Sequence, residues 1–303
     1  MSQKKKLFII DLMAFVYRHY HSFKKNPLKT ADGFQTGCIF GLANDLMQLM
    51  HIHRPDYMIC ATDESRETFR QKLYPDYKAH RPGRPEEIKA QLPLIHEMME
   101  NIMGIPVLYD INFEADDIIG SIVTKFRSEP NLDIFIASGD KDFLQLVGAN
   151  VTLYAHRYGG KIETLNDAGC LQKMGVHQHQ IIDYLALVGD ASDNVPGVDG
   201  VGEKSAVELL SQFGSLENIY IKIDSISSQK LREKLLRGMD SAFLSKELVT
   251  IKIDLPIDID LSMIAFDTTK ILVSEEFKQF ALCLEMRRLS DEISFNQKMV
   301  RKI

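Results

Sequence analysis

Short, uninterrupted apolar segments alternate with amphipathic stretches along the first half of this chain. Strands covered on both faces of a sheet are apolar throughout, whereas surface helices repeat apolar residues every three or four positions. The first pattern predicts strands at 7–10, 57–61, 105–108, 134–137 and 151–155. The second predicts helices at 37–51, 86–103 and 115–127, with another helix after residue 142. The alternation is typical of an α/β fold with a doubly wound, mostly parallel sheet flanked by helices.

The pattern changes near residue 175, where helical spacing takes over. It predicts helices at 178–188, after residue 205 and within 225–250, then an extended connector at 251–261. The last forty residues are expected to form a helix and a basic end. We therefore expect a main domain at 1–174 and a helical subdomain at 175–303.

Acidic residues lie at or just beyond the ends of several predicted strands. In a doubly wound sheet these ends meet at one edge, where ligands bind. Many carboxylates at one edge cannot all stay ionised without cations, and all-oxygen ligation suits Mg²⁺ or Mn²⁺. Two such ions would polarise a phosphodiester and lower the pKa of a bound water. The candidate metal ligands are Asp11, Asp63, Glu114, Asp116, Asp117, Asp140, Asp142, Asp190 and Asp193.

Each of these acids also has an ordinary structural explanation. Asp11 could be a strand-end turn residue, and Asp190 and Asp193 could cap helices. Acids in the first turn of a helix, such as Glu114–Asp117, complement the positive end of its dipole. The whole set favours metal binding, and Asp117 either joins the ligands or lies behind them.

Charge is distributed unevenly. The formal net charge of −6 at first argues against a nucleic-acid partner, but residues 64–92 are basic and carry aromatic side chains. Cations and aromatic rings together are typical of surfaces that hold single strands without sequence preference. The alternative is a solvated, charged loop.

A glycine-rich turn joins two helices of the second region. Gly197, Gly200 and Gly202 allow close approach to a phosphate, and Lys204 and Ser205 follow at the start of the next helix. The spacing fits a helix–hairpin–helix turn that holds a nucleic-acid backbone, which positions a duplex rather than reading its sequence. A tight helix connection would look the same.

Other features of the sequence bound the location of the protein. The composition, 45% hydrophobic and 26% charged, is that of a globular protein. No apolar run is long enough to span a membrane. The four cysteines show no metal-binding spacing and are expected to be buried thiols of a reducing compartment. We expect a cytoplasmic protein that does not bind membranes, and no feature requires more than a monomer.

Several motifs together resemble one known family. They include Phe69-Arg70, Tyr74-Pro75-Asp76-Tyr77-Lys78-Ala79-His80-Arg81-Pro82, Phe113-Glu114-Ala115-Asp116-Asp117, Gly139-Asp140-Lys141-Asp142, Gly189-Asp190-Ala191-Ser192-Asp193-Asn194-Val195-Pro196-Gly197 and Gly200-Val201-Gly202-Glu203-Lys204-Ser205-Ala206. The chain resembles the 5′-nuclease (5′–3′ exonuclease/flap endonuclease) family, most closely the N-terminal domain of bacterial DNA polymerase I. The resemblance extends from Ile9 to about Leu289.

The resemblance implies a PIN-like sheet, a helical arch at 64–92 and a helix–hairpin–helix subdomain. It implies metal-dependent hydrolysis of DNA phosphodiesters at 5′ ends, flaps, nicks and gaps, in replication or repair, with RNA/DNA hybrids as a further partner. Acids matching Asp11, Asp63, Glu114 and Asp116 mainly serve one metal ion in the family. Those matching Asp140, Asp142, Asp190 and Asp193 mainly serve the other, with Asp117 close by.

Basic and aromatic positions carry over in the same way. Lys78 and Arg81 match arch residues that engage the scissile phosphate and the 5′ strand. Arg70 is implied to contact a phosphate and Tyr77 to stack on a base. The glycine hairpin matches a duplex-binding motif that often holds a K⁺ ion.

One position departs from the family pattern, because Leu12 follows Asp11 where glycine is usual. The absence of a polymerase region leads us to expect a free-standing nuclease. Two other classes of function stay open from the residues alone. A metal-dependent phosphatase would use Asp140 and Asp142 but leave the hairpin without purpose, and a DNA-binding protein with relic acids would not need all nine.

Overall fold

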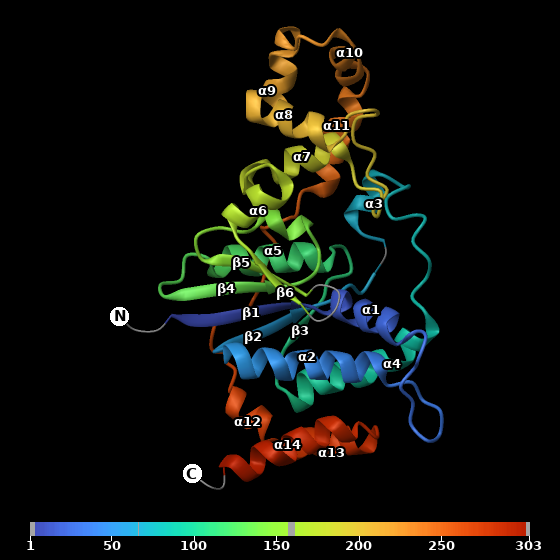
Figure 1. The fold of residues 1–303 in the computed structure, drawn as a ribbon, viewed down its shortest axis with the longest axis vertical. Helices are drawn as coiled ribbons and strands as arrows, with labels where there is room; N and C mark the ends of the chain where they lie inside the picture. Colours follow the sequence, from blue (N-terminus) through green and yellow to red (C-terminus); the bar gives the residue numbers. More distant parts are fainter. Residues whose placement is uncertain (1–3, 66, 157–160, 301–303) are drawn as a thin grey trace.

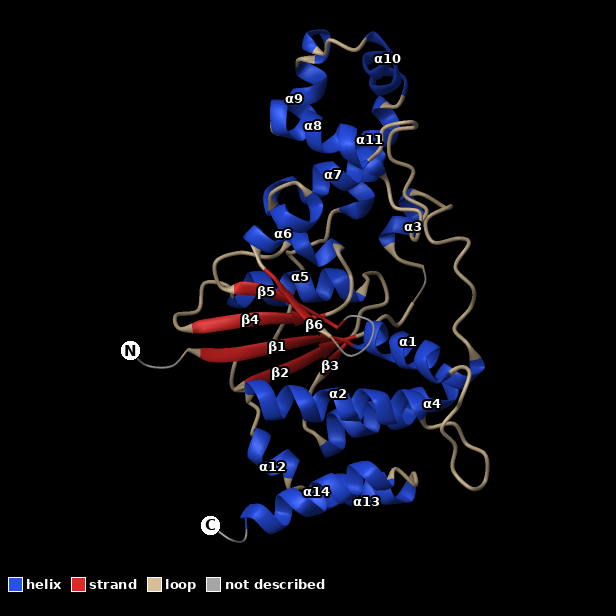
Figure 2. Cartoon of the chain, viewed as in Figure 1, coloured by secondary structure: helices blue, strands red, loops and turns tan. Residues whose placement is uncertain are grey.

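The computed structural model describes residues 4–65, 67–156 and 161–300. Its centre is a six-stranded sheet in the order β3-β2-β1-β4-β5-β6, drawn in red in Figure 2. All neighbouring strands are parallel except β5 and β6. The strands are β1 Lys5–Asp11, β2 Tyr57–Ala61, β3 Val107–Leu108, β4 Leu132–Ala137, β5 Val151–His156 and β6 Ile162–Leu165.

The strand order reverses beside β1. The chain first adds β2 and β3 on one side of β1 and then returns to add β4 on the other. Leu7 lies opposite Tyr57 on β2 and Ile134 on β4, so the carboxyl ends of the three strands reach the same edge. Such a reversal opens a crevice at that edge, where the predicted acids follow the strands.

Helices cover both faces of the sheet (Figures 1 and 2). On one face, Leu7 and Ile9 pack in the same core as Ile118 and Ile122 of α5. Phe8 and Ile10, which alternate with them along β1, enter a second core on the opposite face. The helices of these two layers are α5 Ala115–Phe126 on the first face and α1 Leu12–Phe23, α2 Gly37–His53 and α4 Glu86–Glu97 on the second.

A helical module lies above the carboxyl edge in Figure 1, coloured yellow to orange. Its α11 packs along α7, and the glycine-rich turn lies between α7 and α8. The module and the helix that leads into it consist of α6 Asp167–Met174, α7 Ile181–Val188, α8 Glu203–Phe213, α9 Leu216–Ile221, α10 Gln229–Arg237 and α11 Met239–Val249.

The last helices return to the other side of the molecule (red in Figure 1), away from this module. They are α12 Thr268–Leu272, α13 Glu275–Cys283 and α14 Arg287–Val300. Phe277, Leu289 and Ile293 are buried in the same core as α2. Their position differs from the expectation that 175–303 is one helical subdomain, because this apolar face is covered by the main domain.

The connector at 251–261 is free of regular structure, as expected, and runs along α5. The backbone N–H of Lys252 donates to Asp117, and that of Leu255 donates to the Ser121 hydroxyl. The chain then runs beside the first residues of β2, on the side where the short β3 does not reach, and the N–H of Met58 donates to the carbonyl of Ile264 at 3.0 Å. The connector thus joins the helical module to the C-terminal helices across the sheet domain.

The strands predicted from apolar runs are confirmed, with shifted ends. The pattern missed α1, β6 and α6, and the helix expected after residue 142 is a 3₁₀ turn at Asp142–Gln145. Among the described residues of 64–92, helix is limited to α3 Phe69–Leu73 and the first part of α4, and α4 continues into a π-helical turn at Met98–Ile102. The prolines explain why the rest of this segment is not helical, since proline lacks a backbone N–H donor.

The burial of the cysteines and the lengths of the helices are two features for which the composition led to an expectation. Cys38, Cys60 and Cys170 are buried, but Cys283 is exposed, which corrects the prediction that all four are buried. Within the described ranges, none of the helices combines the length and apolar character that crossing a membrane requires.

Candidate active site

Asp11 ends β1 and also begins α1. One carboxylate oxygen accepts a hydrogen bond from the N–H of Ala14 at 3.2 Å, and the other accepts one from the Ser138 hydroxyl at 2.6 Å. Burial raises the pKa of Asp11 to about 7, and the Asp63 and Asp140 carboxylates act in the same direction. A carboxyl group in this environment gains stability when a cation neutralises it.

Asp140 and Asp142 follow β4 in a tight turn. The N–H of Asp140 donates to the same Ser138 hydroxyl, and the N–H of Asp142 donates to Asp140 Oδ1 at 2.9 Å. Burial, followed by the neighbouring Asp140 and Asp190, raises the pKa of Asp142 well above its usual value. Asp142 Oδ1 is buried and has no hydrogen-bond partner among the described residues. An orphaned buried acceptor beside other carboxylates is what a cation site would explain.

Asp63 and the start of α5 meet at the same edge. Asp63 follows β2 and accepts a hydrogen bond from the N–H of Ala115 at 2.8 Å. Burial raises the pKa of Asp63, and it raises that of Asp116 well above the usual range, with Asp140 and Asp11 adding to the effect. Glu114 is the N-cap of α5 and forms a capping box with Asp117. The structural explanation therefore holds for Glu114, and the raised pKa values of Asp63 and Asp116 agree with the prediction of a cation site.

Asp117 is occupied by other partners. It is completely buried, and its two oxygens accept hydrogen bonds from Arg70 at 2.7 and 2.8 Å. The N–H groups of Glu114 and Lys252 also donate to it. Its lone pairs are used within the protein, which favours the alternative that Asp117 lies behind the predicted metal ligands.

Arg70 and Tyr77 are not available to DNA in this structure. Only 2% of Arg70 and 4% of Tyr77 is exposed. Arg70 also donates to the carbonyls of Leu248 and Thr250, and the Tyr77 hydroxyl donates to Glu114 Oε2 at 3.0 Å. The predictions of a phosphate contact and a stacking ring are therefore corrected. Both side chains instead join the arch segment to the acids.

Basic side chains of the arch segment reach the predicted ligands. Lys78 Nζ lies 2.8 Å from Glu114 Oε1 and 3.4 Å from Asp193 Oδ2, and Arg81 pairs with Asp193. Burial acts to lower the pKa of Lys78, but Glu114 and other acids outweigh it and raise that pKa well above its usual value. Lys78 is therefore a fixed positive charge at the edge of the carboxylate cluster.

Asp190 has a comparable cationic partner. Lys141 Nζ lies 3.0 Å from its Oδ2, and Ser192 donates to Oδ1 from both its N–H and its hydroxyl. Burial favours the neutral acid, but the bonds from Ser192 and Lys141 outweigh it and lower the pKa of Asp190. Ser138 and Lys141 were missed as site residues, although both lie within or next to the motif Gly139-Asp140-Lys141-Asp142.

The donor set fits hard divalent cations, because it consists of carboxylates. Within the described part of the chain, however, no three acidic, histidine or cysteine side chains are already arranged to hold one ion. Glu114, Asp190 and Asp193 are turned toward Lys78, Lys141 and Arg81 instead. The protein's own cations offset part of the negative charge in this arrangement.

The glycine turn is only partly open to a ligand. Gly197 is buried; its N–H donates to the Ser245 hydroxyl and its carbonyl accepts from Ser241. Its assignment to DNA contact is corrected to close packing of the helix connection. Gly200, Gly202 and Lys204 are exposed and Ser205 is half-buried at the start of α8, where a phosphate can approach.

Comparison with known proteins follows the same division of the chain. Residues 6–175 match the family described as 5′-3′ exonuclease, N-terminal resolvase-like domain, and residues 176–271 match its C-terminal SAM fold. This chain belongs to the 5′-3′ exonuclease family. The family assignment confirms the resemblance drawn from the motifs.

Relatives of the 5′-3′ exonuclease family differ in length. A 5′-3′ exonuclease of Aquifex aeolicus is 38% identical over 297 residues, which cover 95% of either chain. DNA polymerase I of Caldicellulosiruptor bescii is 40% identical over 259 residues, 84% of this chain but only 30% of the polymerase. The chain therefore spans about a third of the length of its polymerase relatives.

Solved structures share the fold. The T5 D15 flap endonuclease, in a complex with DNA and metal ions, has a TM-score of 0.67 at 18% identity and covers 95% of this chain and 100% of its own. The catalytic core of Rad2 with a DNA substrate has a TM-score of 0.62 at 16% identity, covering 96% and 91%. At these identities the likeness confirms the mostly parallel α/β architecture.

Proposed function

We propose that this protein is a structure-selective 5′ nuclease, which hydrolyses DNA phosphodiesters near 5′ ends, flaps, nicks and gaps in replication or repair. The observation that carries the proposal is the cluster of carboxylates with raised pKa values at the switch point of the sheet, faced by the cations of the arch segment. Family membership supports the reaction, and the metal-bound T5 structures support a divalent cofactor.

In this proposal the carboxylates bind two divalent ions, Mg²⁺ or Mn²⁺. Five of the acids form no ion pair with a lysine or arginine in the described ranges and would bind the ions first: Asp11, Asp63, Asp116, Asp140 and Asp142. Three more would join after Lys78, Arg81 and Lys141 turn away: Glu114, Asp190 and Asp193. When bound, such ions polarise a phosphodiester and lower the pKa of a water molecule. The division of ligands between two ions stays a prediction.

Lys78 and Arg81 have a role that follows from their present partners. Both now pair with acids of the predicted metal site. Once metal ions neutralise those acids, the two cations lose their partners and can bind the oxygens of the scissile phosphate. Arg81 is half-exposed and can swing outward, whereas Lys78 is more enclosed and would stay near the reacting group.

The helical module would hold the duplex beside this edge. Gly200, Gly202, Lys204 and Ser205 offer backbone donors and a helix N-terminus to phosphates, and a K⁺ ion at the turn is part of the proposal. The structures of the T5 flap endonuclease and of the Rad2 catalytic core, both in complexes with DNA, support this partner. A monomer acting in the cytoplasm, on DNA or RNA/DNA hybrids, completes the proposal.

The test is cleavage of a 5′-flap duplex labelled on the flapped strand. With Mg²⁺ we expect a cut near the junction, and with EDTA none. Asp140→Asn should reduce turnover about a hundredfold or more while DNA binding is retained or improved, because a negative charge leaves the site.

The matched control is Asp133→Asn. Asp133 lies on the same strand, β4, but pairs with Lys4 far from the carboxyl edge, so this variant should cut like the wild type. Metal-dependent cleavage that is equal in both variants would remove Asp140 from the metal site. No metal-dependent cleavage by the wild-type protein would refute the proposed function.

A further inference from the structure

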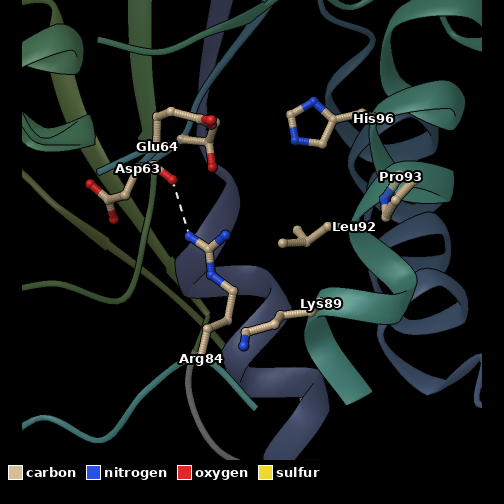
Figure 3. A pocket seen from close by; sticks show the side chains of 8 residues that line it. Asp63, Glu64, Arg84, Lys89, Leu92, Pro93 and His96 are labelled. Atoms are coloured by element: carbon tan, nitrogen blue, oxygen red, sulfur yellow. Dashed lines mark hydrogen bonds between the residues drawn. The ribbon is translucent and has the colours of Figure 1, made fainter. Parts of the chain in front are cut away.

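A cavity of about 270 Å³ adjoins the carboxyl edge without being part of the carboxylate cluster. One wall is the segment 62–64 that follows β2, and the other is α4. Arg84, from the loop that leads into α4, reaches into it from below, and Lys89 approaches from the same end (Figure 3). His96 lies at the opposite end, and Leu92 forms the side between them.

Two basic side chains of this cavity have unused hydrogen-bonding capacity. The Arg84 guanidinium donates to the carbonyl of Asp63 at 3.1 Å and to no other partner in the described ranges. A guanidinium has five N–H donors, so most of them are available to a ligand. His96 Nδ1 lies 4.0 Å from Glu100, beyond hydrogen-bond distance, and its ring nitrogens have no other partner in the described chain.

Lys89 adds a positive charge whose present ion-pair partner can be replaced. It pairs with Glu86 at 2.7 Å, but its side chain is 52% exposed and that of Glu86 is 84% exposed. Exposed ion pairs of this kind are weak, so Lys89 can turn to an anion in the cavity at little cost.

Two acids also border the cavity, but neither fills it. The carboxylate of Asp63 points away toward α5, where it accepts from Ala115 at 2.8 Å (Figure 3). Figure 3 draws the carboxylate of Glu64 on the cavity side, but this side chain is exposed and can turn to solvent when an anion enters. The groups that then face the interior are a guanidinium, an ammonium and an imidazole, next to the apolar side chain of Leu92. This combination suits a phosphate attached to a sugar.

We propose that the cavity binds a phosphate of the 5′ strand, next to the one that is cleaved. The inference rests on the proposed function, because the cavity shares Asp63 with the predicted metal site and a strand that crosses that site would pass into it. A terminal 5′-phosphate and an internal phosphodiester of a flap present the same oxygens to Arg84. The cavity would fix how far the 5′ strand extends beyond the cut.

The test measures the binding of labelled DNA by fluorescence anisotropy, in EDTA so that no cleavage occurs. Three duplexes are compared: a one-nucleotide 5′ flap with a terminal phosphate, the same flap with a 5′-hydroxyl, and a five-nucleotide flap with a 5′-hydroxyl. We expect the wild type to bind the phosphorylated short flap about tenfold more tightly than its hydroxyl form, the gain from charge-assisted hydrogen bonds. Arg84→Ala and His96→Ala should remove most of that difference.

The long flap distinguishes the two sources of phosphate. If an internal phosphodiester occupies the cavity, Arg84→Ala and His96→Ala weaken the long flap as well, and the proposal is supported. His96→Ala matters because His96 touches none of the predicted metal ligands, so its effect cannot come from a displaced Asp63. The control is Lys270→Ala on α12, whose side chain is 81% exposed and whose loss should affect all three duplexes equally or not at all.

The inference is overturned if neither cavity variant changes the binding of any duplex more than Lys270→Ala does. Cleavage of the long flap with Mg²⁺ is measured in parallel on the wild type. Cleavage by the wild type, together with no effect of either cavity variant on binding, refutes the cavity inference alone, whereas absence of cleavage refutes the proposed function.

Discussion

Arg70 lies in a basic segment that was expected to contact DNA, but it is a buried structural residue. Its neighbours in the sequence suggest a cation that meets DNA, but its guanidinium donates to Asp117, Glu114 and two carbonyls at the end of α11. Its burial could not be inferred from the sequence, because its partners come from segments more than 40 residues away. Arg70 therefore joins the arch segment, the start of α5 and the helical module at one point.

Arg70→Gln should destabilise the folded protein by about 3–5 kcal/mol, because it leaves Asp117 as a buried, unpaired carboxylate. Urea unfolding followed by circular dichroism measures the change in the free energy of unfolding. Arg237→Gln on the exposed face of α10 is the control and should change it by less than about 0.5 kcal/mol. Unchanged stability together with weaker DNA binding would restore Arg70 as a phosphate contact.

At the scale of elements, apolar continuity predicted β1, β2, β4 and β5, because strands buried on both faces have no polar alternation. The same reasoning missed α1, whose apolar residues follow Asp11 without a break and read as part of the strand end. It also missed β6, an antiparallel edge strand with one buried residue. The edge acids could be predicted as a set, whereas their pairing with Lys78, Arg81 and Lys141 depends on how distant loops pack.

The connection between α7 and the glycine turn depends on a close approach of two backbones. Gly197 has a φ of +63°, and a Cβ there would lie 2.5 Å from the nitrogen of Gly189. Gly197→Ala should therefore destabilise the protein by about 3 kcal/mol or more and displace the adjoining loop of Asp190 and Asp193. Thermal unfolding and flap binding measure the two effects.

Gly214→Ala is the matched control for this substitution. Gly214 also has a positive φ, +85°, but a Cβ there would meet nothing within 4 Å. It should cost only about 1 kcal/mol of backbone strain and leave flap binding intact. Equal losses in the two variants would mean that backbone strain, rather than the contact with Gly189, makes glycine necessary at Gly197.

At the scale of the whole molecule, the excess negative charge is concentrated where the sheet, the arch segment and the helical module meet. The net charge of −6 therefore says little about DNA binding, since the acids lie together at the sheet edge, where we propose a cation site, and the arch presents its basic side chains beside them. The C-terminal helices pack on the far face of the sheet and leave this edge open. Without metal ions, the edge must be stabilised by protons or by the protein's own cations.

The metal-free protein should lose stability as the pH rises from about 4 to above 7. The pKa of Asp11 is about 7 in the folded protein and about 3.9 in an unfolded chain. Between these values the folded state binds more protons, so this contribution is fully present below pH 4 and is lost as the pH rises through 7. Asp11→Asn cannot ionise, and its melting temperature in EDTA should fall less over this range than that of the wild type.

Mg²⁺ should reverse the loss at pH 8, because it replaces the protons. At a concentration a hundred times its Kd, a ligand that binds only the folded state adds about 2.7 kcal/mol. The wild type should therefore melt at a higher temperature with Mg²⁺ than with EDTA, and Asp11→Asn should gain less. Asp133→Asn, altered far from the edge, should follow the wild type in both series. An Asp11→Asn variant with the pH dependence and Mg²⁺ response of the wild type would show that Asp11 neither retains the proton nor meets the metal ion.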